Sequence, residues 1–143
     1  MNMIRAFESS DMDEVLDIWL QASIRAHSFV DKEFWASQAG AMRDKYIPAS
    51  ETYVFIQNKV IKGFFSLYGD FLAAMFVAPQ DQGQGIGRQL MDKAKSLRKN
   101  LYLTVYRENQ KSLKFYRKNG FIPVREQADQ HTGQLEILLE YSS

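Results

Sequence analysis

The sequence of 143 residues contains no cysteine, and this absence excludes several kinds of chemistry. Disulfide bonds, thiolate metal sites and a cysteine nucleophile all need a thiol, so none of them occurs here. The sequence has only two histidines, and they show no metal-ligand spacing. We therefore expect no bound metal.

Excess charge of one sign and long apolar segments are also missing. Lysine and arginine together number 18 against 17 aspartates and glutamates, for a net charge of +1. Nucleic-acid binding normally needs a clustered basic face, so we expect no nucleic-acid partner. The longest apolar stretch, Phe71 to Ala78, is far too short to span a bilayer. No charged-then-apolar leader with a small-residue cleavage site is visible at the N-terminus. We expect a cytoplasmic protein with no membrane partner.

What is present describes an ordinary soluble globule, with 45% hydrophobic and 24% charged residues. The length allows one domain with a real core but is too short for two, so we expect a single domain over residues 1–143. The sequence leaves open whether the protein is a monomer or a homodimer.

Glycine is concentrated in one segment, residues 82–88. Three of the eight glycines fall within five residues there, after an apolar run and before an amphipathic helix. Glycine is this dense where the backbone must approach a ligand or take positive φ. A loop that opens a helix also offers unpaired N–H groups and the positive end of the helix dipole. The segment therefore predicts a ligand that carries phosphate.

Two common glycine motifs do not fit this segment. In the dinucleotide pattern G-x-G-x-x-G the last glycine would fall on Arg88 or Leu90, and no Gly-Lys-Ser/Thr follows for a Walker loop. What remains is Gln82-x-x-Gly85-x-Gly87, of the form Q/R-x-x-G-x-G/A. Taken alone, it is equally a glycine-rich turn that caps an ordinary helix.

A second pattern follows one helix and one strand later: N-x-x-S-x-x-F-Y-x-K-x-G-F, from Asn109 to Phe121. In this order the two patterns resemble those of the GCN5-related N-acetyltransferases (GNAT). The resemblance runs from Met3 to about Tyr141 and is strongest to small bacterial acetyltransferases of the peptide- or protein-lysine type.

Hydrophobic periodicity, turn residues and capping residues predict the elements. The expected helices run from Ser10 or Asp11, as cap, to about Ala26, from Asp31 to Tyr46 ending before Pro48, from the glycine loop through Leu97, and over Gln110–Asn119. The expected strands are Met3–Phe7, Thr52–Gln57, Val60–Tyr68, Phe71–Val77, Leu101–Tyr106, Phe121–Gln127 and Leu135–Tyr141.

The crossover from Phe71–Val77 through the glycine-opened helix makes that strand parallel to Leu101–Tyr106. The hairpins on either side make the rest antiparallel. We therefore expect an α/β fold: a mixed, mostly antiparallel sheet of six to seven strands with a central parallel pair and about four helices on both faces. The GNAT resemblance implies the same arrangement.

The resemblance implies acetyl-CoA as cosubstrate. In that family the glycine loop holds the pyrophosphate, and pantetheine pairs with the earlier of the two parallel strands, whose backbone N–H polarises the thioester carbonyl. The side chains of that strand are core residues in either case, Arg88 is equally a solvated residue, and Asn109 is equally a helix cap. The implied cofactor-binding residues are Met75, Phe76, Val77, Gln82, Gly83, Gln84, Gly85, Ile86, Gly87, Arg88, Asn109, Ser112, Tyr116 and Lys118.

Tyr116 is implied as the general acid that protonates the coenzyme A sulfur. A tyrosine with a pKa near 10 donates uphill to a thiol near 8.5, by about 2 kcal/mol, which the collapsing intermediate can supply. Without the surrounding pattern, Tyr116 would be read as a buried aromatic beside Phe115.

The general base stays unassigned. Many relatives place a glutamate on the strand that pairs with pantetheine, but Phe71–Val77 has none. Asp70 or His27 could act through water, or a water chain could carry the proton to solvent. His27 is also consistent with a surface or loop-packing residue.

The first two helices and the last hairpin loop frame the acceptor in this family. Phe71, at the mouth of the pairing strand, is the residue of choice for the acceptor end of the catalytic site. The aromatic residues suit an aliphatic amine stem, although Trp35 is also plain core. The expected acceptor-binding residues are His27, Phe29, Tyr46 and Phe71, with Trp35 and the turn at 129–132 nearby.

The sequence thus predicts an N-acetyltransferase that moves the acetyl group of acetyl-CoA to a primary amine in a ternary complex. A protein or peptide lysine or N-terminal amine is favoured as the acceptor. Acetylation of a small-molecule amine, a coenzyme A sensor without catalysis, a nucleotide-binding module and an interaction protein remain as alternatives.

Overall fold

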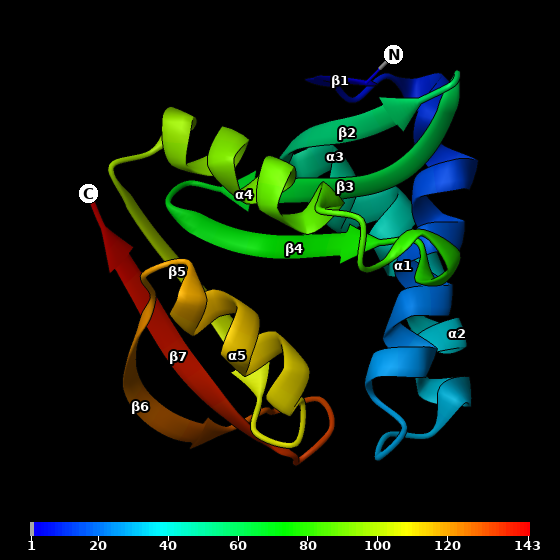
Figure 1. The fold of residues 1–143 in the computed structure, drawn as a ribbon. Helices are drawn as coiled ribbons and strands as arrows, with labels where there is room; N and C mark the ends of the chain where they lie inside the picture. The colour runs from blue at the N-terminus through cyan, green and yellow to red at the C-terminus, as the bar shows by residue number, and fades with distance from the viewer. Residues whose placement is uncertain (1) are drawn as a thin grey trace.

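A seven-stranded mixed sheet forms the centre of the structure, a computed structural model that describes residues 2–143 (Figure 1). The strand order is β1-β2-β3-β4-β5-β7-β6. The strands are β1 (Asn2–Ala6), β2 (Glu51–Gln57), β3 (Val60–Tyr68), β4 (Phe71–Val77), β5 (Asn100–Tyr106), β6 (Ile122–Ala128) and β7 (Leu135–Ser142). The helices are α1 (Met12–Ala26), α2 (Lys32–Ala41), α3 (Ile47–Ala49), α4 (Ile86–Leu97) and α5 (Gln110–Lys118).

The parallel pair β4–β5 sits at the middle of the sheet, and all other neighbours are antiparallel. The two parallel strands share one register pair, Phe71 with Tyr102, and the Tyr102 N–H donates to the Asp70 carbonyl at 3.0 Å. Beyond that point β4 and β5 spread apart (Figure 1). The expected mixed sheet with a central parallel pair is confirmed.

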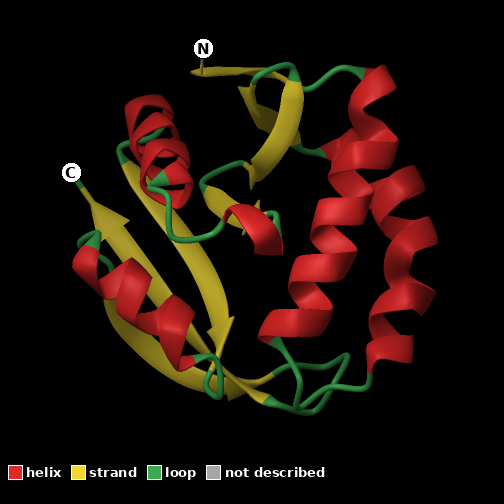
Figure 2. Ribbon diagram, turned by 45° about the vertical axis from the view of Figure 1, so that its right-hand side comes forward, coloured by secondary structure: helices red, strands yellow, loops and turns green. Residues whose placement is uncertain are grey.

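Helices cover both faces of the sheet, as expected (Figure 2). Because successive side chains of a strand point to opposite faces, β3 sends Phe65 and Leu67 to one face and Phe64 to the other. Phe65 and Leu67 pack against Leu90 of α4 and Leu113 of α5. Phe64 packs on the other face, under helices α1 and α2 of the N-terminal half. The sheet therefore separates two hydrophobic cores.

The second predicted helix was wrong at its C-terminal end. The chain stays helical through Pro48, because α2 continues into a π-turn over Met42–Tyr46 and then into α3. Pro48 lies in the first turn of α3, where a backbone N–H is not needed. The wide turn, with the Ile47 N–H bonded to the Met42 carbonyl, resets the hydrogen-bond register before the proline.

Asp11 does not cap α1 in the expected way. It occupies the position before the helix, but its carboxylate makes no cap bond to the amides of α1. The oxygens instead accept from the Arg5 guanidinium at 2.7 and 3.0 Å and from the Glu8 N–H at 2.8 Å. Asp11 thus joins β1 to the entry of α1. The other element ends differ from expectation by one or two residues, the usual variation in such boundaries.

Between residues 2 and 143, no helix combines the length and apolar character needed to cross a membrane.

Candidate active site

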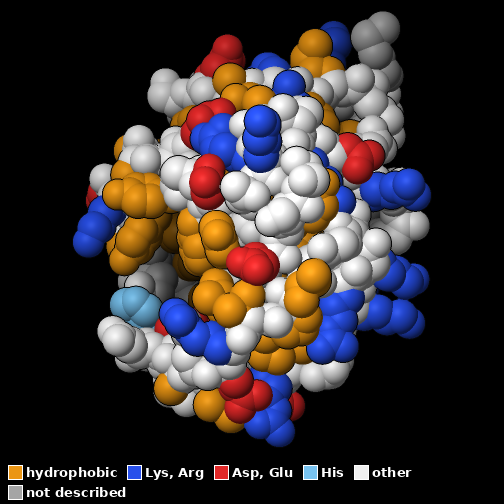
Figure 3. Space-filling view, turned by 90° about the vertical axis from the view of Figure 1, so that its left-hand side faces the viewer, with side chains coloured by type: hydrophobic (Ala, Val, Ile, Leu, Met, Phe, Trp, Pro, Cys, Tyr) orange, Lys and Arg blue, Asp and Glu red, His pale blue; other side chains and the backbone are white. Residues whose placement is uncertain are grey.

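A cavity of about 670 Å³ lies where β4 and β5 diverge. Its walls come from α1, from the segment between α2 and α3, from β4, β5 and α5, and from the β6–β7 turn. Figure 3, with the left-hand side of Figure 1 facing the viewer, shows hydrophobic side chains bordering a hollow in the surface. Eight of the residues singled out from the sequence line this cavity: His27, Tyr46, Phe71, Met75, Phe76, Asn109, Ser112 and Tyr116.

The glycine loop, residues 82–88, does not line the cavity but lies between the end of β4 and the start of α4. The Gln82 side-chain amide donates to the Val77 carbonyl at 3.1 Å and so ties the loop to β4. Gly85 occupies the N-cap of α4 with φ of +82°, a left-handed conformation that favours glycine. The first turn of α4 then presents N–H groups that have no partner within the helix, at the positive end of its dipole.

Gly87 plays a different part from Gly85. Its φ is not positive, and a Cβ built there would lie 3.5 Å from the ring of Phe115 on α5, an ordinary contact distance. Next to it, Ile86 is buried and anchors the first turn in the core, whereas Arg88 is exposed. The turn therefore depends on Gly85, whereas a methyl group at Gly87 would fit beside Phe115.

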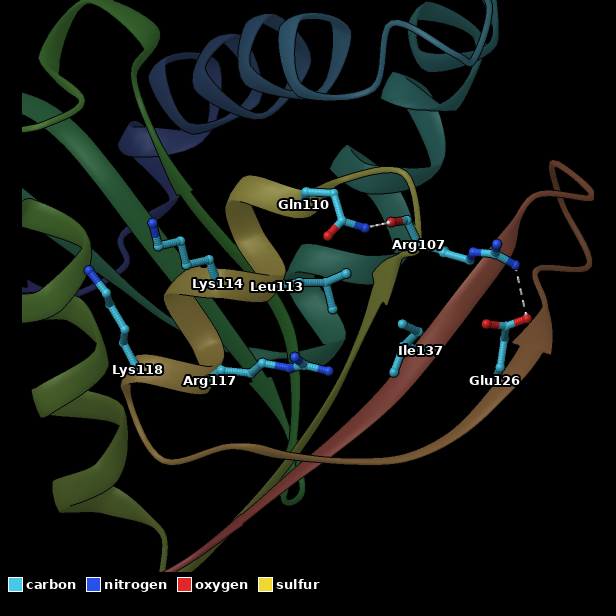
Figure 4. A pocket seen from close by; sticks show the side chains of 8 residues that line it. All are labelled: Arg107, Gln110, Leu113, Lys114, Arg117, Lys118, Glu126 and Ile137. Atoms are coloured by element: carbon cyan, nitrogen blue, oxygen red, sulfur yellow. Dashed lines mark hydrogen bonds and ion pairs between the residues drawn. The ribbon is translucent and has the colours of Figure 1, made fainter.

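Lys118 lies apart from Tyr116. It lines a second, smaller cavity of about 490 Å³ between α5 and the β6–β7 hairpin, which shares no lining residue with the first (Figure 4). Figure 4 shows Lys114 and Lys118 extending from one side of α5, and Arg117 from another, toward Ile137. Lys118 is thus not brought together with the residues around the β4–β5 gap.

Asn109 caps α5, which confirms the interpretation of this residue as a helix N-cap. Its Oδ1 accepts from the Ser112 N–H at 3.2 Å, which fixes the orientation of the amide. The Nδ2 group then lies 3.4 Å from Nε2 of His27. Asn109 therefore links the start of α5 to the end of α1 across the cavity.

Tyr116 projects from α5 into the cavity and is half-buried. Its ring packs edge-on against Phe115 at 5.2 Å and Phe121 at 5.6 Å between centroids. Burial raises the pKa of the Tyr116 phenol above its ordinary value. The phenol is consequently protonated at neutral pH and can donate a hydrogen bond into the cavity.

His27 is a buried residue at the end of α1, in the middle of an aromatic cluster. The centroids of Trp35 and Tyr106 each lie 5.1 Å from its ring, and that of Phe29 lies 5.8 Å away. Burial lowers the pKa of His27 to about 4, so the ring is neutral at pH 7. Phe29 packs against His27 and Tyr106 without lining the cavity itself. Tyr46 and Phe71 do line it.

Two aspartates near the site, Asp70 and Asp129, differ in position. Asp70 is exposed, lies 3.7 Å from the Arg98 guanidinium and does not line the cavity. Asp129, in the β6–β7 turn, does line it and accepts a hydrogen bond of 2.6 Å from the Tyr106 hydroxyl. The turn at 129–132 is therefore fastened to the C-terminal end of β5.

Several cavity residues had not been singled out from the sequence: Thr104, Tyr106 and Glu136. The alternation of β5 carried part of the signal, because Leu101, Leu103 and Val105 pack in the core with α4 and α5. Thr104 and Tyr106 must then point to the other face, into the cavity. Glu136 follows only from the pairing of β7 with β5.

Comparison with known proteins agrees with this geometry. The family model described as "Acetyltransferase (GNAT) domain" matches residues 48–123, more than half of the chain. The chain belongs to the GNAT acetyltransferase family. It is therefore an N-acetyltransferase whose cosubstrate is acetyl-CoA.

Within this acetyltransferase family the chain has relatives in enteric bacteria. It is 35% identical over 120 residues to the peptidyl-lysine N-acetyltransferase YiaC of Escherichia coli, an alignment that covers 83% of this chain and 82% of that protein. It is 28% identical over 120 residues to the peptidyl-lysine N-acetyltransferase YjaB of Salmonella typhimurium, with 82% and 81% covered.

The GNAT fold also matches solved structures over nearly the whole chain. The apo form of YjaB from Escherichia coli has a TM-score of 0.87 at 25% identity and covers 99% of this chain and 97% of that one. The PaiA N-acetyltransferase of Thermoplasma acidophilum, solved with coenzyme A, has a TM-score of 0.84 at 16% identity, with 100% and 99% covered.

Proposed function

We propose that residues 1–143 form one acetyltransferase domain that acetylates the side-chain amine of lysine in a protein or peptide, and that it acts in the cytoplasm without nucleic acid. Two relatives carry the name peptidyl-lysine N-acetyltransferase. The aromatic walls formed by Trp35, Tyr46 and Tyr106 suit an aliphatic stem with a cationic head. A monomer or a homodimer is compatible with this proposal.

The open edge of β4 supports the proposed position of the cofactor. On its other side β4 is paired with β3 from Phe71 to Val77, but toward β5 only Phe71 has a partner. The pantetheine amides can therefore pair with β4 as an added strand would. A backbone N–H near Met75, Phe76 or Val77 would hold the oxyanion, and the amides after Gly85 would hold the diphosphate.

Asn109, Ser112 and Tyr116 line the opposite wall of this gap and would contact the pantetheine arm. Among the loop residues, Gln82, Gly83, Gln84 and Ile86 would shape the diphosphate site. Arg88 and Lys118 would add positive charge for the nucleotide part of the cofactor.

Tyr116 is proposed as the general acid. The neutral acceptor nitrogen attacks the thioester carbon and gives up one N–H proton to a base or to water. The C–S bond breaks, and the phenol proton passes to the departing sulfur. Burial raises the pKa of Tyr116, which by itself weakens the acid. The same burial disfavours the thiolate, so the driving force for protonating the sulfur rises as well. The observation that carries this proposal is that Tyr116 and the open edge of β4 line one cavity.

A thiol-release assay with acetyl-CoA and lysine peptides tests the proposal. The Tyr116→Phe variant should lose about 100-fold or more in kcat, because the proton donor is gone. Its affinity for acetyl-CoA should stay nearly intact, since the loop and β4 are unchanged. Tyr102→Phe is a matched control, because Tyr102 is exposed on β5 and does not line the cavity.

Unchanged turnover in Tyr116→Phe would remove the phenol from the mechanism. If small amines are acetylated but no lysine peptide is, the proposed acceptor is wrong while the transferase activity stands.

A further inference from the structure

The general base that the sequence leaves unassigned can be sought among the cavity residues. Four of the side chains that line the cavity, within the described residues 2–143, are carboxylates or imidazoles: His27, Asp129, His131 and Glu136. They come from the end of α1, from the β6–β7 turn and from the start of β7.

His27 and Asp129 are already committed to the fold. The Nε2 atom of His27 faces Asn109, and its Nδ1 atom is sealed from solvent with no hydrogen-bond partner within residues 2–143. The Asp129 carboxylate accepts three hydrogen bonds, from the Tyr106 hydroxyl at 2.6 Å, the Thr132 hydroxyl at 2.8 Å and the His131 N–H at 3.3 Å. Neither side chain is free to receive an amine or its proton.

Glu136 is placed differently. It is the register partner of Tyr106 in the antiparallel pair β5–β7, so both side chains project from the same face of the sheet. That face carries the aromatic cluster around His27, because Tyr106 packs with Trp35 there. The side chain of Glu136 thus lies on the acceptor side of the cavity.

One oxygen of the Glu136 carboxylate is fixed by a hydrogen bond, and the other keeps its capacity to accept one. The side-chain amide of Gln127 on β6 donates to its Oε2 at 2.6 Å. No hydrogen bond or ion pair engages Oε1 within residues 2–143. Strand β7 therefore presents a carboxylate whose Oε2 is hydrogen-bonded to Gln127 and whose Oε1 can still accept a hydrogen bond. His131, by contrast, is exposed in the turn.

We propose that Glu136 binds the ammonium group of the acceptor lysine and receives the proton that acetyl transfer releases. This assignment rests on the proposed lysine acetyltransferase function and adds the acid–base partner of Tyr116. The bound ammonium first loses one proton to solvent, and the neutral lysine nitrogen then forms a bond to the acetyl carbon. A proton of the now charged nitrogen passes to Glu136 directly or through one water molecule. The C–S bond then breaks, the sulfur takes the proton of Tyr116, and exchange with solvent returns the Glu136 proton to the phenolate.

The timing of the proton transfer follows from the ordinary acidities. A free lysine ammonium, with a pKa near 10.4, would lose its proton to a glutamate near 4.3 only at a cost of roughly 8 kcal/mol. The ammonium has no lone pair with which to attack, so its first proton leaves to solvent and only the small neutral fraction of the amine forms the C–N bond. After that bond forms, the positively charged nitrogen of the intermediate is far more acidic. Glu136 therefore acts first as the counter-ion of the ammonium and then as the proton acceptor.

The test compares Glu136→Gln with two matched variants. Glu140→Gln changes the same residue type on the same face of β7 but outside the cavity lining, and His131→Gln changes the neighbouring imidazole. For each variant, kcat and KM for a lysine peptide are measured between pH 6 and 10, and acetyl-CoA binding is measured by calorimetry. The other titratable groups that line the cavity, within residues 2–143, are His27, Lys45, Tyr46, Tyr68, Tyr106, Tyr116, Asp129 and His131.

The expected result is a loss of about 100-fold or more in kcat/KM for Glu136→Gln. Both KM for the peptide and kcat should change, the variant should regain activity toward high pH, and the Kd for acetyl-CoA should not change. Glu136→Asp should recover part of the activity. The Glu140→Gln control should stay within about threefold of the wild type, and His131→Gln should lose less activity than Glu136→Gln.

Glu136→Gln kinetics that match those of Glu140→Gln would overturn the assignment while the lysine acetyltransferase function stands. A loss that appears in His131→Gln instead would also overturn it. If the wild type acetylates no lysine peptide at all, the proposed function fails, and the role of Glu136 fails with it.

Discussion

Replacing Gly85 by alanine separates what the glycine loop does for the fold from what it does for the cofactor. Gly85 has φ of +82° and ψ of 7°, and a Cβ there would meet no atom within 4 Å. The cost is therefore backbone strain without a clash, about 1–2 kcal/mol for an alanine in the left-handed region. With an unfolding entropy of about 0.3 kcal/mol/K for 143 residues, the Tm should fall by roughly 3–7 °C.

The same substitution should weaken acetyl-CoA more than this strain alone suggests. Any relaxation at Gly85 re-aims the amides that open α4. Each charge-assisted hydrogen bond lost to the diphosphate costs about 1.5–3 kcal/mol, or roughly 10- to 150-fold in Kd. Thermal unfolding without ligand and calorimetry with acetyl-CoA measure the two effects separately.

Gly87→Ala is the matched control. Its φ is ordinary, the new methyl would lie 3.5 Å from Phe115, and the Q/R-x-x-G-x-G/A pattern itself accepts alanine there. Both the Tm and the Kd should stay near the wild-type values. Wild-type acetyl-CoA binding by Gly85→Ala, or greater damage from Gly87→Ala, would refute this role of Gly85.

Two further predictions concern stability and are measured by urea unfolding. The buried hydroxyls of Thr52 on β2 and Ser66 on β3 lie 2.7 Å apart. Thr52→Val should lower the free energy of unfolding by about 1–3 kcal/mol, because it leaves the Ser66 hydroxyl unpaired, and adding Ser66→Ala should recover part of this loss. If the losses of the two single variants simply add in the double variant, the two hydroxyls are not coupled. The pKa of His27 is about 4 in the folded protein and near 6.5 when unfolded, so only the unfolded chain binds the proton between these values. The free energy of unfolding should therefore fall by up to about 3 kcal/mol as the pH drops through this window. In His27→Gln the free energy of unfolding should depend less on pH over the same range. The same pH dependence in both proteins would show that His27 is not buried as a neutral ring.

Local signals were enough to predict most of the fold. The Asn58-Lys59 turn between two alternating strands predicts a hairpin, and both residues have positive φ, 53° and 68°. The apolar stripe of α4, with Leu90, Met91 and Ala94, lies in the core as its spacing predicts. These elements are encoded by residues close together in the chain, so a linear pattern is sufficient.

The π-turn before Pro48 could not be predicted in the same way. A proline usually marks the end of a helix, and only the widened hydrogen-bond register over Met42–Tyr46 lets the chain remain helical. Ile47, almost fully buried against the sheet, shows that tertiary packing holds this segment in place. Such packing is invisible to local propensity.

Some residues of the candidate site belong to short sequence motifs, whereas others are brought there only by strand pairing. Gly85, Asn109 and Tyr116 belong to compact patterns and could be singled out from the sequence. Glu136 sits in no pattern, and its neighbour Tyr106 lies thirty positions earlier in the chain. Only the register of β5 against β7 places the two side by side. A base supplied by strand pairing cannot be recognised from spacing along the chain.

Because β4 and β5 diverge, side chains from both faces of the sheet can line the same cavity. Because β4 loses its β5 partner after Phe71, its backbone groups face a gap that opens toward both layers of helices. On one side α5 provides the phenol of Tyr116, and on the other side α1 and the β6–β7 hairpin provide aromatic rings and carboxylates. In the proposed complex the thioester carbon would lie within this gap, because side chains from both faces line it. Further β4–β5 hydrogen bonds would strengthen the sheet but close this cavity, so the proposed function explains why β4 leaves these backbone groups unpaired with β5.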